Sequence, residues 1–494
     1  MFPLANDTLA DLPPALERPR YDRSQVGVGI AHFGVGNFHR VHQAVYVDRC
    51  LHLPGHQQWG IVGIGISDGP QARTKAEAYR RQDGLFTVTE MSPDGARQAR
   101  VIGAMVDYLL APANPEAVLH QLSDPNLRIV SLTISEGGYP IAADSGDFVD
   151  SDPAIAADIG QTAPPTTVFG FIVRALARRR ADGLPGFTIV SCDNLRGNGA
   201  TTRKAVCGFA RHVDPGLAEW IADQVTFPNS MVDRIAPYVS AADSDQLNAA
   251  TGVDDELPAI GERHLQWVLQ DEFVQGRPAL DQVGVQFRTD VGVFEAVKGR
   301  MLNATHVLMS YPALLLGHRM VHEAMADPDI RHLLETFLAR DVVPRLTGPH
   351  GVDLHAYGEE ILDRFANPAV GDQLIRIATD GSAKIPVFHA ATLADLLAAG
   401  ADIKREAFLL ACYQRYLVEA RDDQGDALEV TEPSLRTEDR ESIPGPDGLG
   451  VLRLEALAAL GLDQHQGFVS SFRQMVAGVR SRGTRATLAY AVQR

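Results

Sequence analysis

A lysine, an asparagine and a histidine lie close together in the sequence, at Lys298, Asn303 and His306. The residues around them are mostly apolar, so a helix through this stretch would be largely buried. A lysine in apolar surroundings loses its proton more easily, because desolvation disfavours the ammonium ion. A neutral amine near neutral pH is a suitable general base. We therefore expect Lys298 to abstract a proton; a solvated lysine and a structural histidine are the alternatives.

Helix geometry brings the polar side chains of this stretch together. At 100° per residue, four of them fall within an arc of about 140° on one side of an α-helix. They are those of Glu295, Lys298, Asn303 and His306. One cavity would then be lined by a carboxylate, an amine, an amide and an imidazole.

Length and composition limit the kind of protein. A chain of 494 residues exceeds one hydrophobic core, and we expect domains over residues 1–288 and 289–494. The net charge of −17 disfavours nucleic acid and anionic membranes as partners. The sequence has no apolar run of membrane-spanning length, and residues 1–20 lack the layout of a secretory signal. The four cysteines are scattered without zinc spacing, so we expect no metal site and a cytoplasmic location.

The first part of the chain has the pattern of a dinucleotide-binding domain. An apolar run over residues 26–33 precedes two closely spaced glycines and a helical segment over residues 41–53. The glycines let the backbone approach a pyrophosphate, which the positive helix N-terminus attracts. The third glycine of the usual fingerprint is missing, so a tight turn without a ligand is the alternative. The predicted cofactor-binding residues here are Phe33, Gly34, Val35, Gly36, Asn37, Phe38, His39 and Arg40.

A second apolar strand, over residues 60–66, is followed by Asp68. An acidic residue at this place holds the adenosine ribose hydroxyls in dinucleotide-binding domains. An N-cap of a helix over residues 71–82 explains Asp68 equally well. Arg73 and Lys75 follow, and their charges would suit a 2′-phosphate, so NADP is considered beside NAD.

Further apolar runs, over residues 86–90, 127–134 and 187–192, alternate with helical segments. This rhythm is typical of an α/β domain with a parallel sheet. Ligands of such sheets bind at the carboxyl ends of strands, where Asn194 is expected, although Asn194 could equally cap a helix. From about residue 289 the strand pattern fades and helical segments follow one another.

Eight motifs, in order along the chain, resemble the polyol-specific long-chain dehydrogenases, the mannitol dehydrogenase family. They are Gly34-Val-Gly-Asn-Phe-His-Arg-x-His42, Ser131-Leu-Thr-Ile-Ser-Glu-Gly-Gly-Tyr139, Ser191-Cys-Asp-Asn194, Phe227-Pro-Asn-Ser-Met-Val-Asp-Arg234, Gln266-Trp-Val, Phe273-Val-x-Gly-Arg-Pro278, Lys298-x4-Asn303-x2-His306 and Asp380-Gly-Ser-x-Lys384. The resemblance covers nearly the whole chain. It implies an α/β fold with a Rossmann-like N-terminal domain and a mostly α-helical C-terminal domain. It also implies zinc-independent chemistry with NAD or NADP on open-chain sugar alcohols, ketoses or uronates.

The resemblance implies roles for individual residues. Lys298 corresponds to the family's general base, and Asn194 and Asn303 to the amide pair that stabilises the developing alkoxide. His306 corresponds to the residue that orients the reacting oxygen, and Glu295 to a carboxylate that passes the proton to solvent. Contacts to the polyol, or supports of its site, correspond to Asp233, Arg376 and Lys384.

We expect an NAD-dependent enzyme that interconverts D-mannitol and D-fructose, as a monomer or small homo-oligomer. D-Arabinitol or another polyol is an alternative substrate, and so is a hexuronate, as in the fructuronate and tagaturonate reductases. Arg300, beside Lys298, suits a substrate that carries a carboxylate, whereas Arg376 is closer to the mannitol-type pattern. The segment Gly261-Glu-Arg-His264 departs from the Cys-Glu-Pro-Phe common in both groups. A nucleotide-binding protein without catalysis is the remaining alternative.

Overall fold

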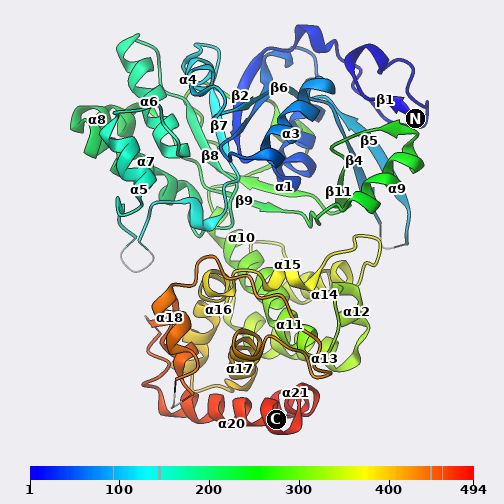
Figure 1. Cartoon of the computed structure of the whole chain (residues 1–494), viewed down its shortest axis with the longest axis vertical. Helices are drawn as coiled ribbons and strands as arrows, with labels where there is room; N and C mark the ends of the chain where they lie inside the picture. Colours follow the sequence, from blue (N-terminus) through cyan, green and yellow to red (C-terminus); the bar gives the residue numbers. More distant parts are fainter. Residues whose placement is uncertain (93, 143–145, 446–447, 459, 494) are drawn as a thin grey trace. The chain divides into compact units, whose positions relative to one another are not determined.

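The computed structural model describes residues 1–92, 94–142, 146–445, 448–458 and 460–493. The chain divides into two compact units (Figure 1). Unit 1 comprises Met1–Ser92 and Ala96–Gly292, and unit 2 comprises Pro93–Gly95 and Val293–Arg494. Unit 1 is an α/β domain and unit 2 is helical, so the predicted fold class is confirmed.

A five-stranded parallel sheet forms the centre of unit 1. In spatial order its strands are β6 (Met105–Leu110), β3 (Gly60–Gly65), β2 (Val28–Phe33), β7 (Ile129–Leu132) and β8 (Thr188–Ser191). This is the strand order of the Rossmann fold. Successive strands move outward from β2 in one direction and from β7 in the other. The carboxyl ends of β2 and β7 therefore form the switch point at which ligands of such sheets bind.

Helices cover both faces of this sheet, which explains the continuous apolar runs of its inner strands. Alternate residues of β2 pack into two separate apolar layers, with Ala31 and Phe33 in one and Ile30 in the other. The layer of Phe33 includes residues of α4 (Pro115–Ser123), α6 (Val168–Ala181), α7 (Asn198–Val213) and α8 (Pro215–Gln224). The layer of Ile30 includes residues of α2 (Gln43–Leu51) and α3 (Pro70–Arg81).

Smaller sheets complete unit 1. They are β11–β4–β5 (Ala259–Glu262, Phe86–Met91, Arg97–Ile102), β13–β12–β9 (Gln286–Phe287, Gln266–Leu269, Ser230–Asp233) and β1–β10 (Phe2–Pro3, Val253–Asp254). Strand β6, at the edge of the main sheet, was not predicted from the sequence. Most of its side chains are partly exposed, so it lacks the apolar run that marks the inner strands.

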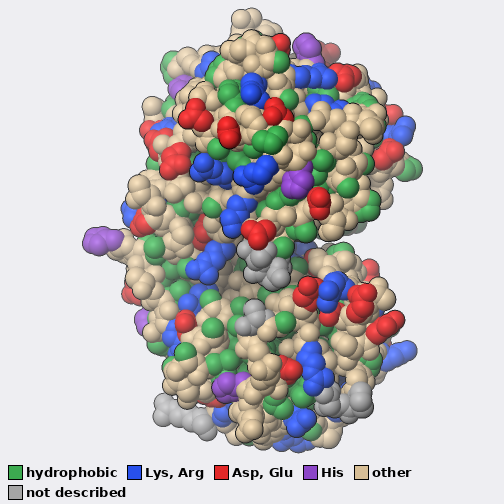
Figure 2. All heavy atoms as spheres, turned by 90° about the vertical axis from the view of Figure 1, so that its left-hand side faces the viewer, with side chains coloured by type: hydrophobic (Ala, Val, Ile, Leu, Met, Phe, Trp, Pro, Cys, Tyr) green, Lys and Arg blue, Asp and Glu red, His purple; other side chains and the backbone are tan. Residues whose placement is uncertain are grey.

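Unit 2 is built around α11 (Ala304–Leu315), all of whose residues are buried. The chain enters unit 2 within α10 (Val291–Val297). The other helices include α12 (Val321–Ala326), α13 (Pro328–Thr336), α14 (Leu354–Phe365), α15 (Leu374–Ala378), α16 (Gly381–Ala398), α17 (Lys404–Glu419), α18 (Thr437–Ser442), α19 (Glu455–Ala458), α20 (Gln466–Arg482) and α21 (Thr484–Val492). Helices α13, α15, α16 and α17 pack directly on α11. Among the described residues, no helix combines the length and apolar character that crossing a bilayer requires. Hydrophobic side chains on the face shown in Figure 2 are scattered among charged and polar ones.

Candidate active site

The turn after β2 depends on a glycine. Gly34 has a φ of +88°, and a Cβ at this position would lie 1.9 Å from the carbonyl oxygen of Thr133. Only glycine fits this conformation and this close approach. Gly36 then precedes α1 (Asn37–Val41), so the helix begins earlier than predicted. It breaks at His42, which separates α1 from α2.

A stacked pair of histidines supports this turn from the interior. The rings of His32 and His39 lie 3.5 Å apart and both side chains are fully buried. The hydroxyl of Thr133 donates to the carbonyl oxygen of Gly34, so it accepts from Nε2–H of His32 at 2.9 Å. Burial lowers the pKa of His32 to about 3 and that of His39 well below its ordinary value. Both rings are therefore neutral, and His39 lies inside the unit, beneath the turn.

Polar side chains fix the start of α1. The amide of Asn37 donates to the carbonyl oxygen of Pro237 at 2.9 Å and accepts from the guanidinium of Arg40. Arg40 is itself buried and donates to the carbonyl oxygen of Leu257. Lys75, on α3, donates to the carbonyl oxygen of Val35. Burial, and then the charge of Arg40, lower the pKa of Lys75 to about 8. A lysine ammonium thus lies at the glycine turn.

Asp68 lies beyond the carboxyl end of β3, and its side chain is 63% exposed. Its carboxylate accepts from the backbone N–H of Gly69 at 2.7 Å and from Arg73 at 3.0 Å. These bonds lower the pKa of Asp68 below its ordinary value, with the Gly69 bond contributing most. The N-cap of α3 is Gly69, without a side-chain hydrogen bond, so the alternative reading of Asp68 as the cap is wrong.

A buried carboxylate at the end of β8 holds the turn that follows β7. Asp193 accepts from the backbone N–H groups of Ile134 and Ser135, at 3.1 and 2.9 Å, and from the hydroxyl of Tyr139 at 2.7 Å. Ser135 has a φ of +65° with an extended ψ, a conformation that costs about 1–3 kcal/mol. Burial raises the pKa of Asp193 to about 6. The Glu136-Gly-Gly-Tyr139 motif thus packs against Asp193.

Asn194 is exposed beside this carboxylate, at the carboxyl edge of the sheet. Helix α7 begins at Asn198 after Gly197, without a side-chain cap, so the alternative reading of Asn194 as a cap is wrong. The amide of Asn198 instead connects the end of β8 with β9, through the carbonyl oxygens of Ser191 and Ser230. Asp233, at the end of β9, is buried and lies 3.4 Å from Nε2 of His264.

A cleft of about 390 Å³ opens beside the Ser135 turn. Its walls include apolar side chains from the residues after β3 and β7 and from the start of α6. Among them are Ile66, Ile134, Tyr139, Val168 and Phe169. The walls also include the polar residues Ser151, Asp152, Thr166 and Thr167, so the cleft is of mixed character.

In unit 2 the helix through the lysine motif is not α-helical throughout. A π-helix spans Lys298–Asn303, and the N–H of Ala304 donates to the carbonyl oxygen of Gly299, five residues earlier. The α-helical spacing used for the prediction is therefore wrong across this turn. An α-helix would place Lys298 and Asn303 140° apart around its axis. A π turn links residue i to residue i+5, which brings these two side chains toward the same side.

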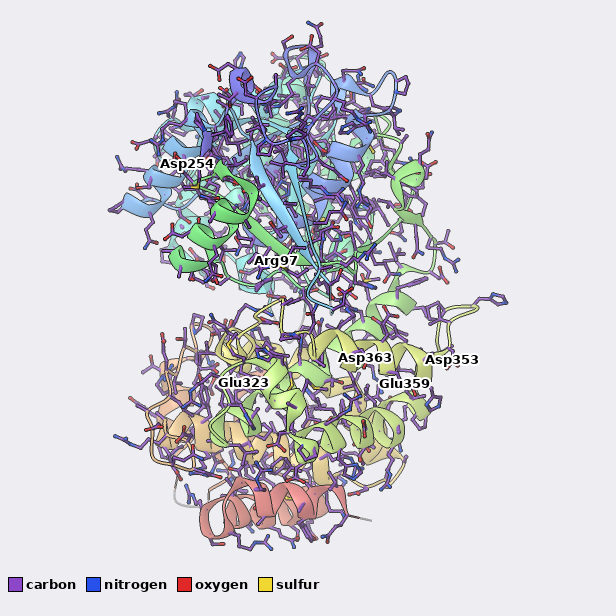
Figure 3. All side chains as sticks on the ribbon, turned by 90° about the vertical axis from the view of Figure 1, so that its right-hand side faces the viewer. Arg97, Asp254, Glu323, Asp353, Glu359 and Asp363 are labelled. Atoms are coloured by element: carbon purple, nitrogen blue, oxygen red, sulfur yellow. The ribbon has the colours of Figure 1, made fainter. Side chains whose placement is uncertain are left out.

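The predicted catalytic side chains differ in burial. Lys298 and His306 are 8% and 7% exposed, whereas Glu295 and Asn303 are half-buried. The imidazole of His306 stacks on Phe365, the last residue of α14. Glu359 and Asp363 mark the exposed side of this helix in Figure 3.

Arg376 and Lys384 are connected through α15. Arg376 forms two hydrogen bonds of 2.7 Å with the buried carboxylate of Asp372. Burial raises the pKa of Asp372, but the charge of Arg376 and its hydrogen bonds lower that pKa below its ordinary value. The ammonium of Lys384 donates to the carbonyl oxygens of Arg376 and Ile377 at 3.2 and 3.1 Å. Lys384 thus supports the helix end that carries Arg376.

Asp372, Phe365 and Asp193 were not among the residues predicted from the sequence. Asp372 stands four residues before Arg376, a spacing that favours an ion pair and was a usable signal. Phe365 and Asp193 gave no separable signal, because their partners come from distant parts of the sequence. Among the described residues, no group of three or more histidine, cysteine or acidic side chains is placed to hold a metal ion.

A Rossmann sheet with a glycine turn at its switch point is the nucleotide-binding module of many dehydrogenases. Comparison with known families identifies both halves of the chain. Residues 28–282 match the Mannitol dehydrogenase Rossmann domain, and residues 290–479 match the Mannitol dehydrogenase C-terminal domain. The chain belongs to the mannitol dehydrogenase family, as its motifs predicted. It is an oxidoreductase acting on CH–OH groups of polyols.

Individual relatives agree with this assignment. The polyol:NADP oxidoreductase of Gluconobacter oxydans is 45% identical over 454 residues, which cover 92% of this chain and 93% of that protein. A solved mannitol 2-dehydrogenase of Pseudomonas fluorescens, in a ternary complex with NAD and D-mannitol, is 39% identical with a TM-score of 0.94, covering 99% of each chain. A solved D-sorbitol dehydrogenase in substrate-free form is 42% identical with a TM-score of 0.84, covering 98% of this chain and 100% of that one.

Proposed function

We propose that this enzyme interconverts D-mannitol and D-fructose with NAD, with Lys298 as the general base. The observation that carries the proposal is the π turn, which brings a buried lysine and an asparagine toward one side of a helix. Its motif agrees with the family to which the solved complex of NAD and D-mannitol belongs. The cofactor supplies the hydride acceptor, and the chain's own residues move the proton and bind the oxygen.

The proton chemistry follows from the residue types. Neutral Nζ of Lys298 accepts the proton of the reacting hydroxyl, and Glu295 passes it to solvent. The amides of Asn194 and Asn303 donate to the developing alkoxide, a role worth roughly 100-fold or more in turnover. His306 orients the same oxygen, with its ring plane set by Phe365. We assign Asp233 and Arg376 as contacts to the polyol and Lys384 as a support of Arg376.

Three features of unit 1 support the assignment of the cofactor site. The turn at Gly34 and Gly36, with the start of α1, suits the pyrophosphate. The cleft beside the Ser135 turn, with its partly apolar walls, suits the adenine ring, and the exposed carboxylate of Asp68 suits the ribose hydroxyls. Asp68 would repel a 2′-phosphate, which favours NAD. Arg73 lies beside it, and a polyol:NADP oxidoreductase is among the relatives, so NADP is the second candidate.

The pairing of Arg300 favours a neutral polyol over a hexuronate. Its guanidinium donates to Thr392 at 2.9 Å and to the carboxylate of Asp395 at 2.7 Å. Its charge is thus already balanced within unit 2, which argues against its use for a substrate carboxylate. D-Sorbitol and D-arabinitol are the next candidates, the first because of the solved D-sorbitol dehydrogenase.

A substrate screen tests this proposal. The purified protein is assayed by NADH or NADPH absorbance with D-mannitol, D-sorbitol, D-arabinitol and D-mannonate, each with both cofactors. We expect the highest kcat/KM for D-mannitol with NAD and no oxidation of D-mannonate. Preference for D-mannonate would contradict the proposal. Preference for another polyol would show that the assigned substrate is wrong, but would leave the proposed proton transfer to Lys298 unaffected.

A further inference from the structure

We propose that helix α16 holds the π-helix Lys298–Asn303 in the register that the proposed catalysis requires. Its positioning residues are His389, Thr392 and Asp395. They are spaced three residues apart and lie on one side of α16. Each of them contacts the π-helix Lys298–Asn303 or the residue directly after it. The proposal rests on the proposed role of Lys298 as the base.

His389 holds the end of the π-helix. Its Nε2 lies 3.0 Å from the carbonyl oxygen of Ala304, and a carbonyl only accepts, so Nε2 carries the hydrogen. Its Nδ1 lies 3.1 Å from both carboxylate oxygens of Glu406, on α17. Both residues are 1% exposed. Ala304 is the residue whose N–H closes the π turn onto Gly299, so this contact fixes the junction between π-helix and α-helix.

Thr392 and Asp395 hold the middle of the same turn. Both bind the guanidinium of Arg300, which is only 13% exposed. The guanidinium of Arg300 is therefore bound to α16, and we assign it no contact with the reacting atoms.

The geometry of a π turn explains why contacts at both Arg300 and Ala304 are needed. A π-helix is rare and less well hydrogen-bonded than an α-helix, so tertiary contacts must maintain it. If the turn relaxed to an α-helix, residues before it would rotate by about 100° relative to residues after it. Lys298 and Asn303 would then move apart around the axis. Contacts to Arg300, within the turn, and to Ala304, after it, oppose this rotation.

Helix α16 is itself firmly anchored. The buried carboxylate of Glu432 accepts from the backbone N–H groups of Gly381 and Ser382, both at 3.0 Å. A Cβ on Gly381 would lie 2.0 Å from the hydroxyl of Tyr311, on α11. The Asp380-Gly-Ser motif thus sets the start of α16 against the core helix, and the position of the later residues follows from it.

The experiment compares variants that remove the contacts with conservative partners. Thr392→Val and Asp395→Ala remove the bonds to Arg300, and Thr392→Ser and Asp395→Glu keep them. His389→Leu removes the donor to Ala304, and His389→Gln offers an N–H in its place. Val387→Ala, at a 44% exposed position of α16, is the control. For each we would measure kcat, KM, the pH profile of kcat/KM, the NADH dissociation constant and the melting temperature.

We expect Thr392→Val combined with Asp395→Ala to lower kcat roughly 10–100-fold, because displacements of about 1 Å in an active site have effects of this size. The acid limb of the pH profile, which reports the base, should also move. The NADH dissociation constant should stay within about twofold, and the conservative variants should recover most of the rate. Should His389→Leu fail to fold, the Thr392 and Asp395 variants still decide the question.

A lower melting temperature with unchanged kcat and pH profile would overturn the positioning role. Lys298→Ala separates this outcome from failure of the proposed function. If Lys298→Ala is inactive while the α16 variants keep the wild-type rate, the positioning role is wrong and the base stands. If Lys298→Ala keeps the wild-type rate, the proposed function itself is wrong.

Discussion

The imidazole of His306 lies flat against the ring of Phe365, with ring centroids 3.6 Å apart and planes inclined by 12°. His306 comes from the buried helix α11 and Phe365 from the end of α14. Stacking leaves the ring edge, with its nitrogens, as the part that can reach a substrate oxygen. The phenyl ring thereby limits the directions in which His306 can donate a hydrogen bond.

Replacing Phe365 should therefore impair orientation. Stacked aromatic pairs contribute about 0.5–1.5 kcal/mol beyond their buried area, so Phe365→Leu should lower kcat/KM up to roughly tenfold. Phe365→Tyr keeps the ring and should stay close to wild type. Steady-state kinetics of polyol oxidation measure the effect. Equal kcat/KM in the Leu and Tyr variants would show that stacking does not orient His306.

Lys298→Ala should abolish polyol oxidation, because the variant lacks the amine that we assign to remove the proton. Binding of NADH, followed by fluorescence, should be unchanged, since the predicted cofactor-binding residues belong to unit 1. A small primary amine added to the assay should restore part of the activity. Lys404→Ala, which changes another lysine of unit 2, serves as the control. Normal turnover by the Lys298 variant would exclude it as the base.

Asp68→Ala should shift the cofactor preference toward NADP. The variant removes a carboxylate that repels a 2′-phosphate and releases Arg73 from its ion pair. Interactions between exposed charges are weak, so the ratio of kcat/KM for NADP to that for NAD should rise by up to roughly fivefold. In Asp68→Ala/Arg73→Ala most of this gain should disappear. An unchanged ratio in the single variant would mean that Asp68 does not face the ribose.

Lys75 should make cofactor binding depend on pH. Its ammonium lies at the carbonyl oxygen of Val35 and its pKa is about 8. The charged form attracts a pyrophosphate, so NADH affinity should fall as the pH rises through about 8. Lys75→Met should bind NADH more weakly at pH 7 and lose this pH dependence. Isothermal titration calorimetry between pH 7 and 9 would measure the NADH affinity of both proteins. If the affinity of wild type and of Lys75→Met changed equally with pH, Lys75 would not be the group responsible.

Asp193 should affect stability between about pH 4 and 6. Burial raises its pKa in the folded protein from 3.8 to about 6. A raised folded-state pKa means that its contribution is fully present below the unfolded pKa and is lost as the pH rises through about 6. Between about pH 4 and 6 the contribution of Asp193 to the free energy of unfolding therefore falls by about 2–3 kcal/mol. The free energy of unfolding in urea of wild type minus that of Asp193→Asn should therefore decrease over this range; a constant difference would refute the assignment.

The sequence alone determined the family, the fold class and the identity of most candidate site residues. The glycine turn, the inner strands and the lysine motif could be predicted because they are local patterns. Backbone conformation and side-chain periodicity depend on residues that are close in the sequence. The fold class and the family are confirmed. The roles of Lys298, Asn194, Asn303, His306 and Glu295 stay predictions.

Tertiary structure alone decided how the candidate residues are held. The sequence did not reveal the π turn, because its register depends on contacts with α16, some 90 residues later in the chain. Nor did it reveal that Arg300 is already paired, that His306 rests on Phe365 or that Asp193 holds the Ser135 turn. Such pairings join residues that are distant in sequence, and only packing brings them together. Residue types therefore indicated the chemistry, and long-range contacts set its geometry.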